Sequence, residues 1–298
     1  MQAHQWQWGI DQWVEYLKDK ETPVLPSTRQ VLAELQEGGE ERRDNLAARE
    51  LVDIVYADPY LALKLLRRAE ERRSRQLGHD TTTPLAAVLQ TGFDELREIV
   101  ASSPPDTATL PGCRACEQRA VLASTIARAW ANRRADVSPD EVALAALLVD
   151  TAELLLWHFA SEMTDQETQV RDWNEFFWAL MPRRSAIEFT FRQLTMALAQ
   201  AWELPNLIVM LIKGTDTPRA NIARLACAAA RQIGHAPQPA SLLAVLQEIA
   251  KVIPDASLAE LTEPLPLTDE MRADLQAALA AANDSAPVTP PDQPAPPT

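Results

Sequence analysis

Hydrophobic positions recur at intervals of three and four residues along almost the whole chain, which is the spacing of one face of an α-helix. The spacing is continuous within stretches such as LAARELVDIVYAD and ASLLAVLQEIAKVI, and proline or glycine often separates one stretch from the next. The strict alternation typical of a half-buried strand stands out nowhere in the sequence. The pattern therefore predicts an all-α fold, a compact multi-helix bundle.

A short helical extension is predicted at the N-terminus, over residues 1–20. The segment WQWGIDQWVEYLKDK places Trp6, Trp13 and Leu17 at helical spacing, so that they form one apolar face. Such a face most often packs onto the rest of the protein. If this face is exposed, its tryptophans would anchor a partner protein, so the three residues are candidates for partner binding.

A second aromatic face is predicted in DWNEFFWALMPRR, where Trp173, Phe176 and Phe177 lie three and four residues apart or side by side. Packing in the core is again the common use of such a face, and partner binding is the alternative. Exposure decides between the two uses. If both aromatic faces are buried, the partner site lies elsewhere.

The main domain is expected over residues 21–217. The helical patterns over residues 218–283 either complete this domain or form a small subdomain of their own. The last thirteen residues, APVTPPDQPAPPT, contain six prolines and almost nothing that can be buried. A disordered Pro-rich tail is therefore predicted over residues 284–298.

Charge and composition narrow the classes of function. Lys and Arg number 28 against 42 Asp and Glu, which gives a net charge of −14 and makes nucleic acid a poor partner. We find no apolar run long enough to cross a bilayer and no secretion signal at the N-terminus, so no membrane association is expected. The three cysteines are too few for a disulfide framework, which fits a reducing compartment. These features predict a cytoplasmic location.

The pair Cys113 and Cys116 forms a CxxC motif, which could be half of a zinc site or a redox pair. There is no second CxxC, and His79, His158 and His235 lie far apart in sequence, so each histidine is interpreted as a surface or capping residue. The favoured interpretation is two incidental cysteines, with no metal and no cofactor. Gly-rich phosphate loops and nucleophile elbows are also missing from the sequence.

The order of several segments resembles the HDOD domain, a non-catalytic relative of the HD metal-dependent phosphohydrolases in bacterial signalling proteins. The resemblance runs from about Pro23 to Lys213. It rests on VLPSTRQVLAEL, ELVDIVYADPYLALKLLRRA, TTTPLAAVLQTGFDELREIV, ALLVDTAELLL and AWELP. Each segment alone is a weak signal, whereas five in the right order are fairly specific.

The resemblance implies that the metal centre of the HD enzymes has decayed in this chain. Active enzymes use a histidine, an adjacent His-Asp pair and a later aspartate. These positions fall on Gln118, on Val149 and Asp150, and on Cys227. A divalent metal site needs about three or more protein donors, so no metal and no metal-assisted hydrolysis are implied. We expect Gln118, Asp150 and Cys227 to lie close together as a remnant of the centre.

Asp150 lies within the apolar run LAALLVDTAELLLWH, and it needs a partner if it is buried and charged, because an isolated buried carboxylate is too costly. The candidate hydrogen-bond donors are Gln118, Thr151, Arg119 and Arg114. The resemblance implies a non-enzymatic regulatory module that binds a kinase, a receiver or a cyclic-dinucleotide enzyme in trans. The alternative is a residual phosphohydrolase or a cyclic-nucleotide-binding protein that uses the old metal cavity.

Overall fold

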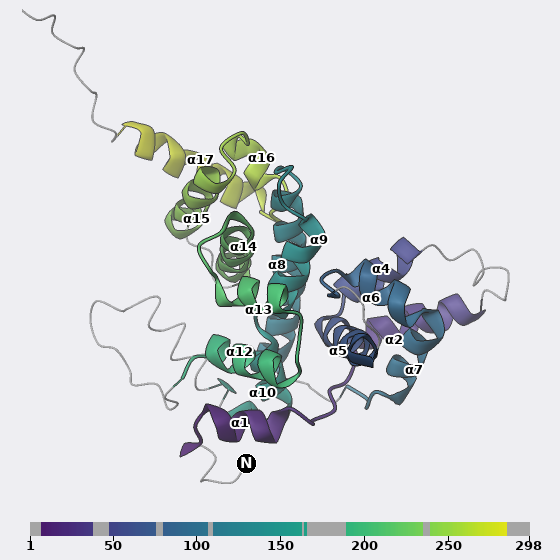
Figure 1. The fold of residues 1–298 in the computed structure, drawn as a ribbon. Helices are drawn as coiled ribbons and strands as arrows, with labels where there is room; N and C mark the ends of the chain where they lie inside the picture. The colour runs from purple at the N-terminus through teal and green to yellow at the C-terminus, as the bar shows by residue number, and fades with distance from the viewer. Residues whose placement is uncertain are drawn as a thin grey trace, which may run out of the picture.

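The regular elements of the computed structural model are all α-helices, as the spacing of the apolar residues predicts (Figure 1). The structure describes residues 7–37, 48–75, 80–106, 110–162, 164–165, 189–234 and 239–284, and no strand occurs within these ranges. The all-α prediction is therefore confirmed. Residues 285–298, which carry most of the predicted Pro-rich tail, lie outside the described part of the chain.

The N-terminal half folds into a lobe of short helices that pack around α5. Leu61, Leu65 and Leu66 of α5 are fully or almost fully buried and recur at helical spacing, which gives this lobe its core. Thr83 caps α6 by accepting a hydrogen bond from the backbone N–H of Ala86 at 3.2 Å. The helices of the lobe are α2 (Pro26–Glu37), α4 (Ala48–Tyr56), α5 (Pro59–Arg75), α6 (Pro84–Thr91) and α7 (Phe93–Ser102).

The centre of the fold is the long helix α8 (Pro111–Ala131), which lies along α9 (Pro139–Leu148) (Figure 1). The chain continues from α9 into α10 (Thr151–Phe159), which also contacts α8. Small buried residues of α8, including Ala120, Ala123 and Ala127, allow the neighbouring helices to approach closely. This arrangement brings the N-terminal turns of α8 and α10 together.

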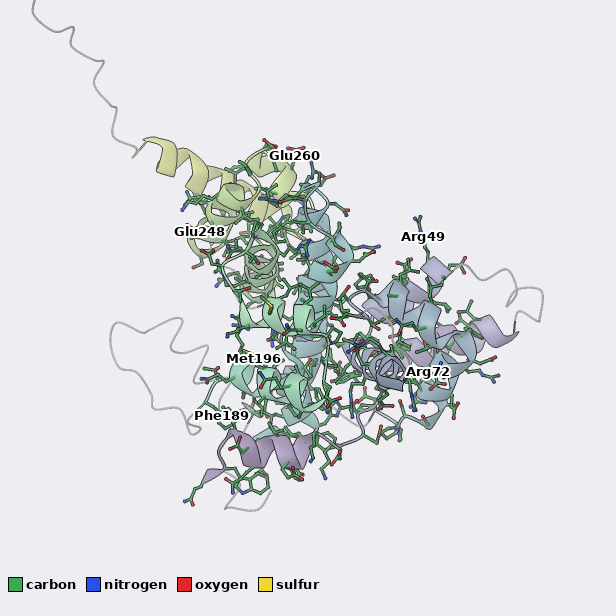
Figure 2. The ribbon with its side chains drawn as sticks, viewed as in Figure 1. Arg49, Arg72, Phe189, Met196, Glu248 and Glu260 are labelled. Atoms are coloured by element: carbon green, nitrogen blue, oxygen red, sulfur yellow. The ribbon has the colours of Figure 1, made fainter. Side chains whose placement is uncertain are left out.

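The C-terminal helices pack on α8 and α9 and extend the same hydrophobic core. Trp130 at the end of α8 is buried, and its indole N–H donates a hydrogen bond to the carbonyl of Leu261 at 2.9 Å. At the surface, Arg49 and Glu248 point into solvent (Figure 2). The helices are α12 (Phe191–Ala201), α13 (Asn206–Lys213), α14 (Pro218–Gly234), α15 (Pro239–Val252), α16 (Leu258–Thr262) and α17 (Asp269–Asp284).

The apolar run that predicts one central helix is divided into α9 and α10 at Val149 and Asp150. Thr195 of α12 satisfies backbone groups on both sides of the break. Its hydroxyl donates to the carbonyl of Val149 at 3.0 Å and accepts from the N–H of Ala152 at 3.1 Å. Because a buried backbone polar group is costly when unpaired, this one side chain stabilises the change in helix direction.

The expectation that no apolar run is long enough to cross a bilayer is wrong, because one run has the required length and composition. Residues 139–159 meet both criteria, with a mean hydropathy of 1.6 in the most apolar window. That window is 89% buried inside the fold, as the core helix of a helical bundle is. The run is apolar because protein surrounds it on nearly all sides.

The N-terminal helix α1 (Ile10–Leu17) packs against α10 and α12. Trp13 and Leu17 are both 0% exposed and share a core cluster with Leu155 and Leu198. The packing interpretation therefore holds for these two residues, and the exposure that partner binding would require of them is not met. The other candidates, Trp6, Trp173, Phe176 and Phe177, lie outside the described residues.

Candidate functional site

Four polar side chains meet in the core where the N-terminal part of α8 faces the start of α10. Cys116 and Arg119 lie three residues apart on α8, and Asp150 and Glu153 lie three residues apart at the N-terminal end of α10, so each pair shares one helix face. All four residues are buried. The end of α10 that carries the two carboxylates is also the end whose helix dipole favours negative charge.

Arg119 is the centre of this group, which we call the Arg119 cluster (Cys116, Arg119, Asp150 and Glu153). Its Nε donates to Oδ2 of Asp150 at 2.9 Å. Its Nη2 lies 2.9 Å from Oε1 of Glu153 and donates to Sγ of Cys116 at 3.1 Å. One planar guanidinium group therefore binds both carboxylates and the sulfur, which uses the fixed fork of donors that distinguishes arginine from lysine.

The charges of the cluster are paired inside the core. Burial acts to lower the pKa of Arg119, but Asp150, Cys116 and Glu153 outweigh it and hold the pKa above its usual value. Arg231 of α14 approaches the other oxygen of Asp150, with Nη2 at 3.6 Å from Oδ1. Two arginines thus face two carboxylates, so burial of the carboxylates leaves no uncompensated charge.

The Arg119 cluster does not fit a divalent metal. The donor atoms of Cys116, Asp150 and Glu153 lie within 4.8 Å of one another, close enough to share an ion. The guanidinium of Arg119 already binds all three donors, so a metal would have to displace a buried cation from them. A positive side chain thus takes the place that an ion would occupy.

The predicted remnant of the HD centre is brought together only in part. Asp150 and Val149 are buried at the break between α9 and α10, and Cys227 of α14 is buried with its thiol donating to the carbonyl of Ala146 at 3.7 Å. Burial, and then the nearby Asp150, raise the pKa of Cys227 to about 12. Asp150 and Cys227 are therefore close enough to interact, as predicted.

Gln118 does not join them. It is exposed, and the partner of Asp150 is the next residue, Arg119. Neighbouring positions on an α-helix point about 100° apart, so a shift of one residue turns a side chain from the surface to the core. The expectation that an arginine could pair with Asp150 is confirmed for Arg119, and the expectation that Gln118 faces the cluster is wrong.

Two members of the cluster were not predicted to pair with Asp150 or Arg119: Glu153 was not singled out from the sequence, and Cys116 was noted only as part of the CxxC motif and interpreted as incidental. The available signal was spacing. Glu153 is one helical turn from Asp150 in the same apolar run, and Cys116 is one turn before Arg119. Two acids on one helix and a cation on a facing helix indicate a buried ion-pair network, but the pairing of the two helices is not visible in the sequence.

An open groove of about 550 Å³ lies between α4 and the helices α8 and α9, and none of the Arg119 cluster residues lines it. Arg128 lies over the ring of Tyr56, with 4.9 Å from its guanidinium carbon to the ring centroid, and pairs with Asp140 at 3.1 Å. The hydroxyl of Tyr56 donates to Oδ1 of Asp140 at 3.1 Å. The remaining lining residues are Ser124, Thr125, Ala129, Asn132 and Pro139.

Comparison with known proteins gives one family and several solved structures with a similar fold. The family model of the HDOD domain matches residues 25–218. The MmoQ response regulator from Methylococcus capsulatus str. Bath is 19% identical, with a TM-score of 0.56 over 87% of this chain and 98% of that chain. A virulence factor (cj0248) from Campylobacter jejuni subsp. jejuni is 16% identical, with a TM-score of 0.66 over 89% and 98%. No curated protein matches the chain. At these identities the two structures establish a shared fold alone.

Proposed function

The chain belongs to the HDOD domain family, and from this premise we propose that it is a non-enzymatic regulatory protein that acts by binding other signalling proteins. The observation that carries the proposal is the Arg119 cluster. Its guanidinium binds the three donors that would otherwise be available to a catalytic ion. The position that corresponds to the metal centre of the HD enzymes is then a structural ion-pair network. Its donor atoms are already bound to Arg119, which disfavours hydrolysis by a metal-bound water there.

The proposed partners are signalling proteins such as a kinase, a receiver or a cyclic-dinucleotide enzyme, met in the cytoplasm. The description of MmoQ as a response regulator, which concerns that protein, agrees with a signalling role. Nucleic acid is disfavoured because a net charge of −14 repels a phosphate backbone.

The open groove beside α4 is the surface that we propose for partner contact. Arg128 and Tyr56 are held in place by Asp140 before any partner arrives, so they would lose little conformational entropy on binding. Tyrosine and arginine are also among the residues that contribute most to protein interfaces. The two aromatic faces singled out from the sequence give no described surface of this kind, since Trp13 and Leu17 are buried.

A binding experiment tests the proposal directly. The full chain is immobilised, and purified signalling proteins of the same organism (sensor kinases, receivers and cyclic-dinucleotide enzymes) are passed over it one at a time. We expect one class to bind at micromolar or lower Kd, and the Arg128→Glu variant to weaken that complex. Arg97→Glu is the matched control, because Arg97 is a similarly exposed arginine on α7, with an i,i+3 acidic partner. Equal weakening by the two variants would remove the groove from the proposal.

A hydrolysis assay tests the non-enzymatic part. The purified chain is incubated with Mg²⁺ or Mn²⁺ and with a phosphomonoester, a phosphodiester and a cyclic dinucleotide. We expect no turnover above the buffer control. Turnover that is lost in Asp150→Asn and retained in Arg97→Glu would contradict the proposal and restore the alternative of a residual phosphohydrolase.

A further inference from the structure

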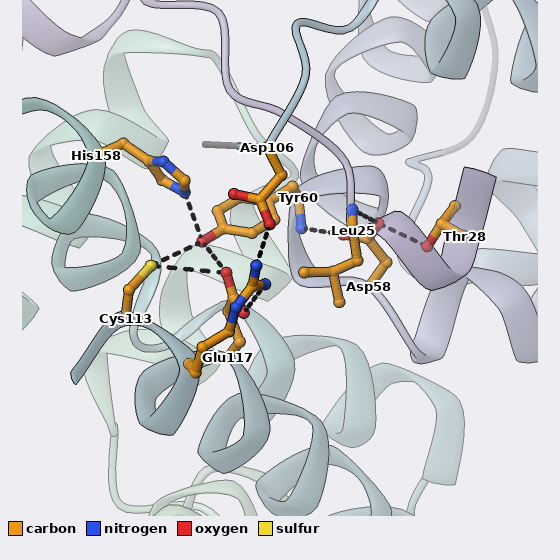
Figure 3. Close-up of polar contacts among 9 residues, drawn as sticks. Leu25, Thr28, Asp58, Tyr60, Asp106, Cys113, Glu117 and His158 are labelled. Atoms are coloured by element: carbon orange, nitrogen blue, oxygen red, sulfur yellow. Dashed lines mark hydrogen bonds and ion pairs between the residues drawn. The ribbon is translucent and has the colours of Figure 1, made fainter. Parts of the chain in front are cut away.

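A second cluster of buried polar side chains lies beside the first, between α5, α8 and α10 (Figure 3). Cys113 and Glu117 lie four residues apart on α8, His158 lies near the end of α10, and Tyr60 lies in the first turn of α5. Cys113, Glu117 and Tyr60 are buried and His158 is partly buried. We call these four residues the Tyr60 cluster. None of them belongs to the Arg119 cluster or lines the open groove.

The donor atoms lie close together, and those of Cys113, Glu117 and His158 are all within 4.8 Å of one another. The hydroxyl of Tyr60 lies 2.9 Å from Oε1 of Glu117, 2.9 Å from Nε2 of His158 and 3.9 Å from Sγ of Cys113. Sγ of Cys113 lies 3.6 Å from Oε1 of Glu117. A tetrahedral ion with bonds of about 2.0 to 2.3 Å separates its ligand atoms by about 3.3 to 3.8 Å. The four separations given above, from 2.9 to 3.9 Å, lie on both sides of that spacing.

The donor types suit a zinc-like ion. Thiolate, imidazole and carboxylate are the three protein ligand types that zinc takes. Burial is the main influence that lowers the pKa of His158, which favours the neutral imidazole that a metal requires. Burial, followed by Glu117, raises the pKa of Cys113 to about 12, so in the absence of a cation this thiol stays protonated.

The surrounding charges also favour a dication. Arg114 binds Oε2 of Glu117 at 2.9 Å and Oδ2 of Asp106 at 2.6 Å, which orients the carboxylate so that Oε1 faces Tyr60 and Cys113. With a thiolate at Cys113, the negative charges of Cys113, Glu117 and Asp106 exceed the positive charge of Arg114 by two. A divalent ion makes this set of charges neutral, which lowers the electrostatic cost of burying Cys113 and Glu117.

Tyr60 is fixed before any ion arrives. Asp58, which is fully buried before the start of α5, accepts hydrogen bonds from the N–H groups of Tyr60 at 2.9 Å and Leu61 at 3.0 Å. Its other oxygen accepts from the hydroxyl of Thr28 and the N–H of Leu25, each at 2.7 Å (Figure 3). The turn that carries Tyr60 is therefore locked to α2, and the phenol is held against α8 and α10.

We propose that Cys113, Glu117 and His158 bind a divalent metal ion of the zinc class, with the hydroxyl of Tyr60 as the fourth donor. Binding forms a metal–sulfur bond, breaks the S–H bond of Cys113 and releases that proton to solvent. The ligands come from α5, α8 and α10, so the ion joins the N-terminal lobe to the central helices. All four positions around the ion are filled by protein, which makes it a structural site.

Metal uptake by the full-length chain tests this inference. The protein is stripped with a chelator, dialysed against Zn²⁺ and analysed for bound metal by mass spectrometry. We expect an equimolar amount of zinc in the wild type and in Cys227→Ser, which changes another buried thiol, and loss of zinc in Cys113→Ser. Arg114→Ala, which removes the group that orients Glu117, should weaken binding by about 10- to 100-fold.

Cobalt substitution gives a second readout that depends on the ligand atoms. Co²⁺ in the wild type should show a thiolate-to-metal charge-transfer band together with the strong visible bands of a tetrahedral centre. Both should persist in Cys227→Ser and disappear in Cys113→Ser. A folded wild-type protein that takes up neither Zn²⁺ nor Co²⁺ would overturn the inference, whatever the variants do. Retention of the charge-transfer band in a folded Cys113→Ser protein would overturn it as well.

Discussion

The two polar clusters of this protein have similar donor atoms, but the side chains that join those atoms differ in charge. Both lie between α8 and α10, and each combines a cysteine of α8 with buried carboxylates or an imidazole. In the Arg119 cluster the central group is a guanidinium, which carries its own positive charge. In the Tyr60 cluster the side chain that contacts the other three is a neutral phenol, which supplies no positive charge. The comparison indicates that a donor set with its own buried cation is already satisfied, whereas a set joined by a neutral group is suited to the external cation proposed above.

The largest expected effect is a change in what the Arg119 cluster binds. In Arg119→Ala the donors of Cys116, Asp150 and Glu153 keep their separation of at most 4.8 Å and lose the cation between them. We expect this variant to take up a further equivalent of zinc, measured by the same metal analysis and stabilising against heat. Unchanged metal content in a folded Arg119→Ala protein would show that the guanidinium is not what keeps metal out of this cluster.

Without added metal, loss of the guanidinium should be strongly destabilising. Arg119→Met keeps a long apolar side chain but leaves Asp150 and Glu153 buried without their shared partner, which should lower the free energy of unfolding by about 3 to 5 kcal/mol. Urea denaturation measures the change. Arg133→Met is the control, because Arg133 pairs with Glu260 and Glu263 at the surface and should contribute at most about 1 kcal/mol. Similar losses in both variants would contradict the paired, buried role of Arg119.

Both clusters depend on the close approach of α8 and α10, which Gly112 permits. A Cβ atom at Gly112 would lie 2.3 Å from Cζ2 of the buried Trp157. Gly112→Ala should therefore cost about 1 to 3 kcal/mol through overpacking, and it should weaken metal binding at the adjacent Cys113. Gly9→Ala is the control because nothing lies within 4 Å of its Cβ position. Thermal denaturation and zinc titration of both variants check the expectation.

Thr195 supports the Arg119 cluster indirectly. It stabilises the break between α9 and α10, and that break sets the position of Asp150. Thr195→Val keeps the shape of the side chain and removes the hydroxyl that serves Val149 and Ala152, which should cost about 1 to 3 kcal/mol. Thr125→Val removes an exposed hydroxyl on α8 and should be nearly neutral. Hydrogen exchange at Ala152 should accelerate in the first variant only. Unchanged protection there would mean that the break does not depend on Thr195.

The smallest expected effect is a pH dependence due to Cys227. The folded protein holds the pKa of this thiol at about 12, against about 8.5 for an exposed cysteine. Between those values the unfolded chain loses the proton first, so stability falls as the pH rises above about 8.5, by about 1 kcal/mol near pH 9.5. Cys227→Ala should remove this part of the slope in urea denaturation at several pH values. A steeper slope in the variant would contradict the assignment.

The sequence predicts the helices well and the sites poorly, for physical reasons. Helix formation depends on local spacing, so the apolar periodicity predicts the α-helices correctly, and Asp150 stands out because a carboxylate is unexpected in an apolar run. The break at Val149 was missed because the apolar pattern continues through it, and the side chain that stabilises it, Thr195, is 46 residues away from Val149. His158 was interpreted as a surface or capping residue for the same reason, since its partner Tyr60 is 98 residues away.

The burial of α1 bears on what counts as one folding unit. The family match begins at residue 25, after α1, and ends at residue 218, where α14 begins. Trp13 and Leu17 nevertheless fill a core cluster with α10 and α12, and the indole of Trp202 donates to the carbonyl of Lys18 at 2.9 Å. A chain trimmed to residues 25–218 would therefore expose apolar surface of α10 and α12 at one end and of α8 at the other. The segment that the family model matches is therefore shorter than the segment that buries its own apolar surface.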